Sequence, residues 1–399
     1  MQIGVYIGSY QPESGGAYTF VEDIFDAFLQ VAATSNHSFV VFCNKEAISA
    51  VQKKINSANI TIQSFSNSGV FPRLISRLEF FSPLFRWAYR RSKFFSSRTN
   101  PHKLDLIWFV GVETYQCPEI PYITTLWDLQ HRYQPFFPEV SIDGVWDTRE
   151  QFFSYFLKRS AYCLTGTETG KREIQHFYQL SEPRVRVFPL PTPQYVINAA
   201  DSTIEVKKHF GIDKDYIFYP AQFWPHKNHI NLISALKILK SDYGLDLALV
   251  LTGSDKGNRK FIENYVDEEA LTDSVHFLGF VSKEEIIAIY RQAKALTFMT
   301  YFGPDNIPPL EAFALGCPVI ASSVDGAKEQ YNDAAILVDP SSPKEIADAI
   351  WKLINDPILR DSLIATGYQK SKQWTSTDYV NSAFELFGEF SNIRKNWPS

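Results

Sequence analysis

Residues 295–322, ALTFMTYFGPDNIPPLEAFALGCPVIAS, contain the succession of elements that decides the fold of this chain. Residues 295–300 are apolar and partly β-branched, as in a strand that is buried on both faces of a parallel sheet. Pro308 and Pro309 favour the first turn of a short helix, and Gly316 suits the left-handed position that ends one. An apolar run follows Gly316 directly. The stretch therefore predicts a strand, a loop, a short helix and a second strand.

The loop at residues 303–307 is a candidate anion site, because it leads into a helix start. Free N–H groups and the positive end of the helix dipole favour a phosphate there. Glu311 lies in the first helical turn. Its carboxylate either caps the helix or accepts hydrogen bonds from a vicinal diol such as a ribose, and the stretch alone leaves both interpretations open.

Composition limits the class of protein. The 399 residues predict two or three domains, and 45% hydrophobic with 21% charged residues is typical of a globular chain. A net charge of −5 opposes general nucleic-acid binding. The N-terminus lacks a basic leader and no run is long enough to span a membrane, so we expect a cytoplasmic protein. The four cysteines include no C-x-x-C pair and are expected to be buried thiols.

Strands and helices alternate along the whole chain, with strands expected at residues 3–7, 39–43, 60–65, 106–110, 122–126, 162–166 and 185–188. Residues 189–202 carry three prolines without helical periodicity and are expected to connect two domains. A second alternating set begins at residue 216. We predict an α/β fold with two Rossmann-like, doubly wound domains, residues 1–195 and 203–376, which face each other across a cleft.

Several polar or glycine-containing loops directly follow predicted strands, where open α/β sheets place their ligands. Gly15 and Gly16 end the first such loop and permit close approach of a phosphate, although ordinary turn chemistry explains them equally well. Asp128 follows the strand at 122–126, and Gly253 follows the strand at 248–252. Asp128 is a candidate for a polar catalytic role, with helix or turn capping as the alternative.

Lys227, in the loop AQFWPHKNH at residues 221–229, is expected near a helix start. A cation opposes the helix dipole there unless an anion lies between them, which favours a phosphate contact over simple surface charge. His226 and His229 have no third ligand nearby, so no metal site is predicted.

Residues 71–103 carry eight Lys or Arg and the single acid Glu79. A helix beginning near Pro83 would have one apolar and one cationic side. One hypothesis is contact with an acceptor or with the inner face of the plasma membrane, to be tested by replacing Arg86, Arg90 and Arg91 with Gln. The alternative is a solvated helix that packs on its own domain.

Three segments, YPAQFWPHKNHINLISAL, FLGFVSKEEIIAIYRQA and YFGPDNIPPLEAFALGCPVIAS, resemble the retaining glycosyltransferases of the group 1 (family 4) type with the GT-B fold. The resemblance implies that the second domain holds a nucleotide-sugar donor, with a UDP-sugar, UDP-glucose in particular, favoured. It further implies a saccharide or lipid-linked acceptor in the first domain, a role in bacterial polysaccharide synthesis, and a final helix at 377–397 that crosses back. The sequence shows no acidic cluster placed to hold a cation at the diphosphate, so we expect no metal or other cofactor.

The resemblance also assigns residues. Lys227 matches the lysine on the donor diphosphate, Glu311 the acid that holds the ribose, and Gly16 the glycine loop beneath the phosphates. The predicted catalytic residues are Lys227, Asp128 and Asp305. The predicted donor contacts are Gly15, Gly16, Gln222, Lys227, Gly253, Phe280, Val281, Asp305, Asn306, Ile307, Pro308 and Glu311.

The chain departs from the family pattern at three positions. Gly303 stands where the family has a first acid, Gln222 where it has an arginine, and Trp127 where it has a histidine. Transfer by front-face attack, with Asp128 orienting a hydroxyl, ranks above a double displacement with Asp305 as nucleophile. A nucleotide-sugar 2-epimerase and a non-catalytic nucleotide-sugar-binding subunit are the alternative functions.

Overall fold

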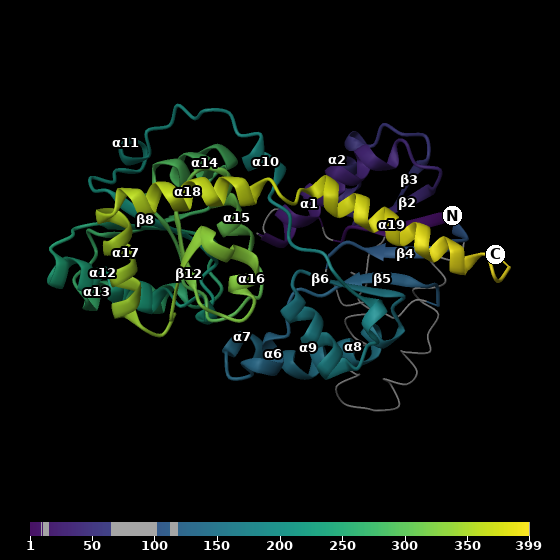
Figure 1. Ribbon diagram of the computed structural model, residues 1–399, viewed down its shortest axis with the longest axis horizontal. Coiled ribbons are helices and arrows are strands. Elements are labelled where there is room, and N and C mark those ends of the chain that lie inside the picture. Colours follow the sequence, from purple (N-terminus) through teal and green to yellow (C-terminus); the bar gives the residue numbers. More distant parts are fainter. Residues whose placement is uncertain (9, 11–15, 65–101, 112–118, 399) are drawn as a thin grey trace.

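The computed structural model describes residues 1–8, 10, 16–64, 102–111 and 119–398. Gly15, Cys117 and residues 71–101 of the basic stretch lie outside this part of the chain. The described strands form two parallel sheets, one in each lobe of Figure 1. The inner strands are short, apolar and almost fully buried, as expected when helices cover both faces, whereas the edge strands of both sheets are only partly buried.

The N-terminal sheet has seven described strands in the order β3-β2-β1-β4-β5-β6-β7. The strand order changes direction between β1 and β4, and this change leaves a crevice at the carboxyl ends of these two strands. The strands are β1 Gln2–Tyr6, β2 Ser38–Cys43, β3 Ile60–Ser64, β4 Leu106–Phe109, β5 Tyr122–Thr125, β6 Tyr162–Thr165 and β7 Val185–Val187. The described helices of this lobe are α1 Gly16–Ala32, α2 Ile48–Lys54, α6 Gln130–Tyr133, α7 Pro138–Ser141, α8 Val145–Arg159 and α9 Glu168–Tyr178.

The C-terminal sheet has six strands in the order β10-β9-β8-β11-β12-β13. The strands are β8 Tyr216–Pro220, β9 Ala248–Thr252, β10 Val275–Gly279, β11 Leu296–Phe298, β12 Val319–Ser322 and β13 Ala335–Val338. Its helices are α11 Val206–Phe210, α12 His229–Tyr243, α13 Arg259–Glu268, α14 Lys283–Gln292, α15 Ile307–Ala314, α16 Ala327–Tyr331, α17 Pro343–Asn355 and α18 Pro357–Ser371. The unit predicted at 295–322 is confirmed as β11, α15 and β12, and Gly316 has the expected left-handed backbone with φ of 71°.

The chain passes between the lobes twice, and the two passages run side by side. The first contains α10 (Gln194–Ile197), and the second leads from α18 into α19 (Ser376–Arg394), the yellow helix that lies over the N-terminal lobe in Figure 1. Thr192 pairs with Thr375, and Trp374 Nε1 donates to the Pro189 carbonyl at 2.8 Å. Phe387 of α19 is fully buried in the N-terminal core. The predicted return of the last helix to the first domain is therefore confirmed.

Candidate functional site

A cleft of about 580 Å³ lies between the two sheets. It is lined by every predicted catalytic or donor-binding residue that the structure describes, and by residues that were not predicted, including Tyr195, Trp224 and Lys283. We call Gly16, Trp127 and Asp128 the N-terminal wall, and Lys227, Asp305 and Glu311 the C-terminal wall. Bringing these residues together does not test their individual roles, which remain predictions.

Lys227 ends a single turn of 3₁₀-helix, Pro225–Lys227, which immediately precedes α12. Its carbonyl accepts a hydrogen bond from the buried Tyr219 hydroxyl at 2.8 Å. Asn228 follows with φ of 57° and separates the turn from the helix. The backbone of Lys227 is thus fixed by β8 beneath it.

The Lys227 side chain lies in an apolar setting. Its Nζ is 5.2 Å from the centroid of the Phe298 ring, and the described residues offer it no salt bridge. Burial lowers the pKa of Lys227 to about 8, although Asp128 and Glu139 oppose this shift. A buried cation without a counter-ion is costly, and a diphosphate in the cleft would supply one.

Glu311, in α15, has both carboxylate oxygens occupied. Tyr195 donates to Oε1 at 2.7 Å and Tyr290 donates to Oε2 at 2.8 Å. Burial nevertheless raises the pKa of Glu311. The two tyrosine hydroxyls act in the opposite direction, but they are neutral donors and do not offset the effect of burial. Each oxygen has further acceptor capacity, so the carboxylate can still receive hydroxyl groups from a ligand.

The start of α15 offers fewer N–H groups than we expected from the sequence. Pro308 and Pro309 have none, and the Asn306 N–H donates to Gln330 Oε1 at 2.8 Å. Ile307 remains as the residue whose N–H this first turn can present to a ligand. An anion at this position would therefore depend more strongly on Lys227 than it would at a helix start with all of its N–H groups free.

Two glycines of the C-terminal wall are required by close contacts. Gly253 has φ of 134°, and a Cβ there would come within 2.5 Å of the Ala221 carbonyl oxygen. Gly303 has φ of 126°, and a Cβ would lie 2.9 Å from the Asn306 side-chain oxygen. The backbone at Gly303 consequently disfavours the acid that the family carries at this position.

Asp305 contacts the opposite domain. A Cβ added at Gly166, which follows β6, would fall only 1.5 Å from Asp305 Oδ2, so the carboxyl group packs directly on this glycine. Oδ2 has no hydrogen-bond partner among the described residues. Burial raises the pKa of Asp305 to about 7, against a hydrogen bond from the Leu190 N–H.

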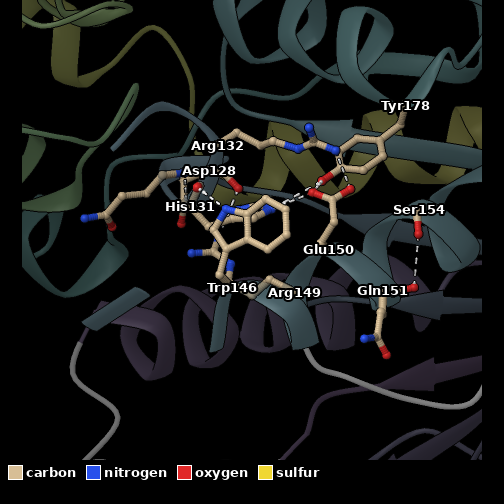
Figure 2. A network of polar contacts seen from close by, with 10 residues as sticks. Asp128, His131, Arg132, Trp146, Arg149, Glu150, Gln151, Ser154 and Tyr178 are labelled. Carbon is tan, nitrogen blue, oxygen red and sulfur yellow. Dashed lines mark hydrogen bonds and ion pairs between the residues drawn. The ribbon is translucent and has the colours of Figure 1, made fainter. Parts of the chain in front are cut away.

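Asp128, in the loop after β5, is held by two donors on one oxygen (Figure 2). Arg149 Nη2 of α8 donates to Oδ1 at 2.6 Å, and the Gln130 N–H donates to the same atom at 3.0 Å. Burial would raise the pKa of Asp128, but the Arg149 guanidinium and the Gln130 N–H together hold it below its usual value. Asp128 is therefore an ionised hydrogen-bond acceptor at neutral pH.

Helix α8 also contacts α6, the short helix that directly follows this loop (Figure 2). Glu150 pairs with Arg132 at 2.5 Å and lies 3.4 Å from His131 Nε2, while Trp146 Nε1 donates to the His131 carbonyl at 2.7 Å. Burial lowers the pKa of His131 to about 4, so the imidazole is neutral. His131 is therefore a fully buried, uncharged residue of the N-terminal lobe.

The sequence did not predict α6, α7 or α8, nor the residues that they contribute. Arg149 occupies an ordinary position in an amphipathic helix, and no motif marks it as a partner of Asp128. Glu139 of α7 pairs with His226 across the domains, and Tyr195 reaches Glu311 from the linker. Such partners are found only when the fold brings distant segments together.

Several other contacts join the two lobes beside the cleft. Glu329 of α16 accepts from the N–H groups of Glu168 at 2.5 Å and Thr169 at 3.3 Å, at the start of α9. Lys283 pairs with Glu22 at 2.8 Å. The two lobes are thus in direct contact beside the cleft.

Within the described residues, no three His, Cys, Asp or Glu side chains are grouped so that they could hold a metal ion. None of the described helices combines the length and apolar character needed to cross a bilayer. Of the predicted buried thiols, Cys43, Cys163 and Cys317 are free and buried.

Comparison with known families gives a match over residues 202–370 to the model described as "Glycosyl transferases group 1". Among curated proteins, the O-antigen chain mannosyltransferase RfbU of Salmonella typhimurium is 28% identical over 225 residues, which are 55% of this chain and 58% of that protein. The O-antigen chain mannosyltransferase B of Escherichia coli is 22% identical over 221 residues, with the same two shares of 55% and 58%. The match thus covers little more than half of these relatives.

Solved structures match nearly the whole chain. Sucrose-phosphate synthase from Thermosynechococcus elongatus has a TM-score of 0.73 at 18% identity, covering 98% of this chain and 100% of that one. Anabaena HepE in complex with UDP-glucose has a TM-score of 0.68 at 15% identity, covering 98% and 100%. WaaG, a glycosyltransferase involved in lipopolysaccharide biosynthesis, also has a TM-score of 0.68 at 15% identity, covering 96% and 99%. These likenesses establish the two-domain GT-B fold.

Proposed function

We propose that this protein is a retaining glycosyltransferase, because residues 202–370 match the group 1 glycosyl transferase model and the chain has the GT-B fold. It would transfer a sugar from a nucleoside-diphosphate sugar to a saccharide or lipid-linked acceptor in bacterial polysaccharide synthesis, in the cytoplasm. The observation that carries the proposal is the cleft itself. It places the unpaired cation of Lys227 and the carboxylate of Glu311 opposite the ionised Asp128.

A UDP-sugar, with UDP-glucose as the first choice, is the donor that we propose. The structural likeness to Anabaena HepE, whose complex contains UDP-glucose, supports this choice. The two curated relatives are mannosyltransferases, so mannose-bearing nucleotides are the main alternative. Lys227 would contact the diphosphate and Glu311 the ribose hydroxyls.

In the mechanism that we favour, the acceptor attacks from the face that the diphosphate leaves. The acceptor oxygen bonds to the anomeric carbon while the bond from that carbon to the phosphate oxygen breaks, and the acceptor proton passes to that phosphate oxygen. Lys227 would stabilise the negative charge that grows on the leaving group. Asp128 would accept a hydrogen bond from a sugar or acceptor hydroxyl and so orient it.

The route through a covalent intermediate ranks second. It requires an ionised carboxylate beside the anomeric carbon, and Asp305 is the candidate. Its pKa of about 7 leaves much of it protonated at neutral pH, and its carboxyl group packs against Gly166. Both features favour the front-face route.

The first experiment is a thermal-shift panel of UDP, GDP and ADP, since a ligand at one hundred times its Kd stabilises by about 2.7 kcal/mol. Transfer is then measured with the matching sugar nucleotides, and the anomeric configuration of the product is read by NMR. A product of inverted configuration would refute retention. Incubating the donor alone detects a new epimer, the outcome expected of a 2-epimerase. Donor binding without transfer or slow hydrolysis would identify a non-catalytic subunit.

We further propose that the reaction needs no divalent metal, because Lys227 can oppose the diphosphate charge directly. Activity should survive an excess of EDTA. Complete loss with EDTA and recovery with Mg²⁺ or Mn²⁺ would contradict this.

A further inference from the structure

We propose that Arg149 of α8 is a positioning residue of the transfer reaction, which orients Asp128 so that one carboxylate oxygen is available to a hydroxyl group in the cleft. This inference rests on the proposed glycosyl transfer. Arg149 and the Gln130 N–H both donate to Asp128 Oδ1, at 2.6 Å and 3.0 Å. No described donor occupies Oδ2, and Asp128 lines the cleft. Oδ2 is thus the oxygen left for a ligand.

Arg149 fixes the backbone of Asp128 as well as its side chain. The same Nη2 lies 3.3 Å from the Asp128 carbonyl oxygen. The guanidinium stacks over the ring of Phe153, one helical turn further along α8, with 5.5 Å between the charged carbon and the ring centroid. Since Phe153 is buried in the N-terminal lobe, Arg149 is held by packing and not by its charge alone.

The residue next to Arg149 strengthens this arrangement. Glu150 contacts Arg132 and His131 of α6, the short helix that follows the loop of Asp128, and Trp146 donates to the His131 carbonyl. Helix α8 therefore contacts both Asp128, in the loop after β5, and helix α6, which follows that loop (Figure 2). A short loop anchored in this way to a 15-residue helix presents Asp128 with little freedom, as a positioned acceptor requires.

The charges around Asp128 explain why this arginine matters for its ionisation. The groups that interact with Asp128 electrostatically come from five other elements: His131 of α6, Arg149 of α8, Glu173 of α9, His226 and Lys227 of the 3₁₀ turn, and Asp305 of the loop before α15. Without Arg149, the acidic Glu173 and Asp305 would be opposed chiefly by Lys227. The donor diphosphate would then neutralise Lys227, and Asp128 would become harder to ionise.

The experiment compares Arg149→Gln and Arg149→Lys with a matched control, Arg186→Gln. Arg186 also pairs with one carboxylate, Glu389 at 2.7 Å, and lies over one aromatic ring, Tyr162, but it is outside the cleft. We expect Arg149→Gln to lower kcat/KM for the acceptor about 10- to 100-fold, the scale of a displaced catalytic group, with donor Kd nearly unchanged. Arg186→Gln should match the wild type.

The pH profile separates positioning from a merely structural role. Arg149→Gln should move the acid limb of kcat/KM to higher pH, because Asp128 loses an adjacent opposite charge. Arg149→Lys keeps the charge but not the forked geometry, so it should restore the acid limb and recover the rate only in part. The Lys variant also serves where the Gln variant folds poorly.

Two results would overturn the inference: an unshifted acid limb in Arg149→Gln, or a rate loss that simply adds to that of Asp128→Asn in the double variant. If the wild type transfers no sugar from any donor, the proposed function fails and amide hydrogen exchange decides the inference on its own. Faster exchange at residues 128–132 in Arg149→Gln, and not in Arg186→Gln, would support it. Equal exchange in both variants would refute it.

Discussion

On the N-terminal wall of the cleft, Asp128 is paired with Arg149 at 2.6 Å and its pKa is held below the usual value. On the C-terminal wall, Lys227 has no described counter-ion and Asp305 no cation, and burial brings their pKa values to about 8 and about 7. The carboxylate of the first wall is therefore paired with a cation, whereas Lys227 and Asp305 of the second wall have no charged partner among the described residues. The first wall is electrostatically complete without a ligand, and the second is not.

This difference indicates how each wall works. A buried charge without a partner is destabilising, so the protein tolerates it where a ligand will supply the missing charge. Lys227 fits this description under the proposed function, in which the donor diphosphate would be its counter-ion. A paired carboxylate such as Asp128 has a fixed orientation, so its proposed role is to orient a hydroxyl group. Substitutions of the unpaired groups should therefore affect a different step of the reaction from substitutions of the paired groups.

The largest effect is expected from Lys227→Ala. Negative charge on the leaving diphosphate grows in the transition state, so kcat should fall about 10²- to 10³-fold, more than donor Kd rises. Gln222 offers no second cation to compensate. Because the free enzyme needs Lys227 protonated, kcat/KM for the donor in the wild type should fall as the pH rises through about 8.

The control for Lys227 is Lys256→Ala. Lys256 also lies over an aromatic ring of this domain, Trp224, at 5.8 Å, but its side chain is exposed. It should retain wild-type kcat. Lys227→Arg, which stays charged, should remove the fall near pH 8. An unchanged kcat in a well-folded Lys227→Ala variant would exclude the assigned role.

Asp305→Asn tests the second unpaired group, and its main effect is on stability. The pKa of Asp305 is about 7 in the folded protein and 3.8 in the reference state, so the unfolded chain loses the proton first. The free energy of unfolding of the wild type should therefore fall between about pH 4 and pH 7 and stay low above that. The Asn variant should lack this fall and be more stable above pH 7, by at most about 4 kcal/mol.

Denaturant unfolding at pH 4.5 and pH 8 measures this difference, with the exposed Asp333→Asn as the matched control. Equal pH dependence in wild type and Asp305→Asn would show that Asp305 is not buried uncharged in solution. The same variant bears on the mechanism. Complete loss of transfer would favour the covalent route, whereas the front-face route predicts a smaller loss than that of Lys227→Ala.

The C-terminal wall could be predicted from the sequence because its residues lie in local units. Pro308, Glu311 and Gly316 each have a defined place in one short helix, and Lys227 has a defined place before another. Local spacing therefore fixes both the structure and the candidate roles. The one local expectation that needed correction was the number of free N–H groups at α15, since two prolines and the bond from Asn306 to Gln330 remove most of them.

The N-terminal wall could be predicted only in part. Asp128 was found because it follows a strand, but its charge state depends on Arg149, 21 residues later in a helix that the sequence did not reveal. Tyr195 and Glu311 are 116 residues apart. Charge pairing between such distant residues leaves no pattern in one sequence, because periodicity reports which face is buried and not what that face contacts.

The smallest effect is expected at Tyr195, which belongs to neither wall and contacts the C-terminal wall through the Glu311 carboxylate. Tyr195→Phe removes one neutral hydrogen bond of 2.7 Å, and Tyr290 still holds the other oxygen at 2.8 Å. Losing one such bond costs about 0.5–1.5 kcal/mol, so donor Kd should rise roughly 2- to 10-fold. Kcat should hardly change, because the ribose contact is the same in the ground and transition states. Isothermal titration with the donor nucleotide measures Kd, and Tyr265→Phe, whose hydroxyl bonds Ser234 at 2.8 Å outside the cleft, is the control. A tyrosine that acted on catalysis would lower kcat with Kd unchanged, and that result would remove Glu311 and its two tyrosines from the donor-binding role proposed for the C-terminal wall.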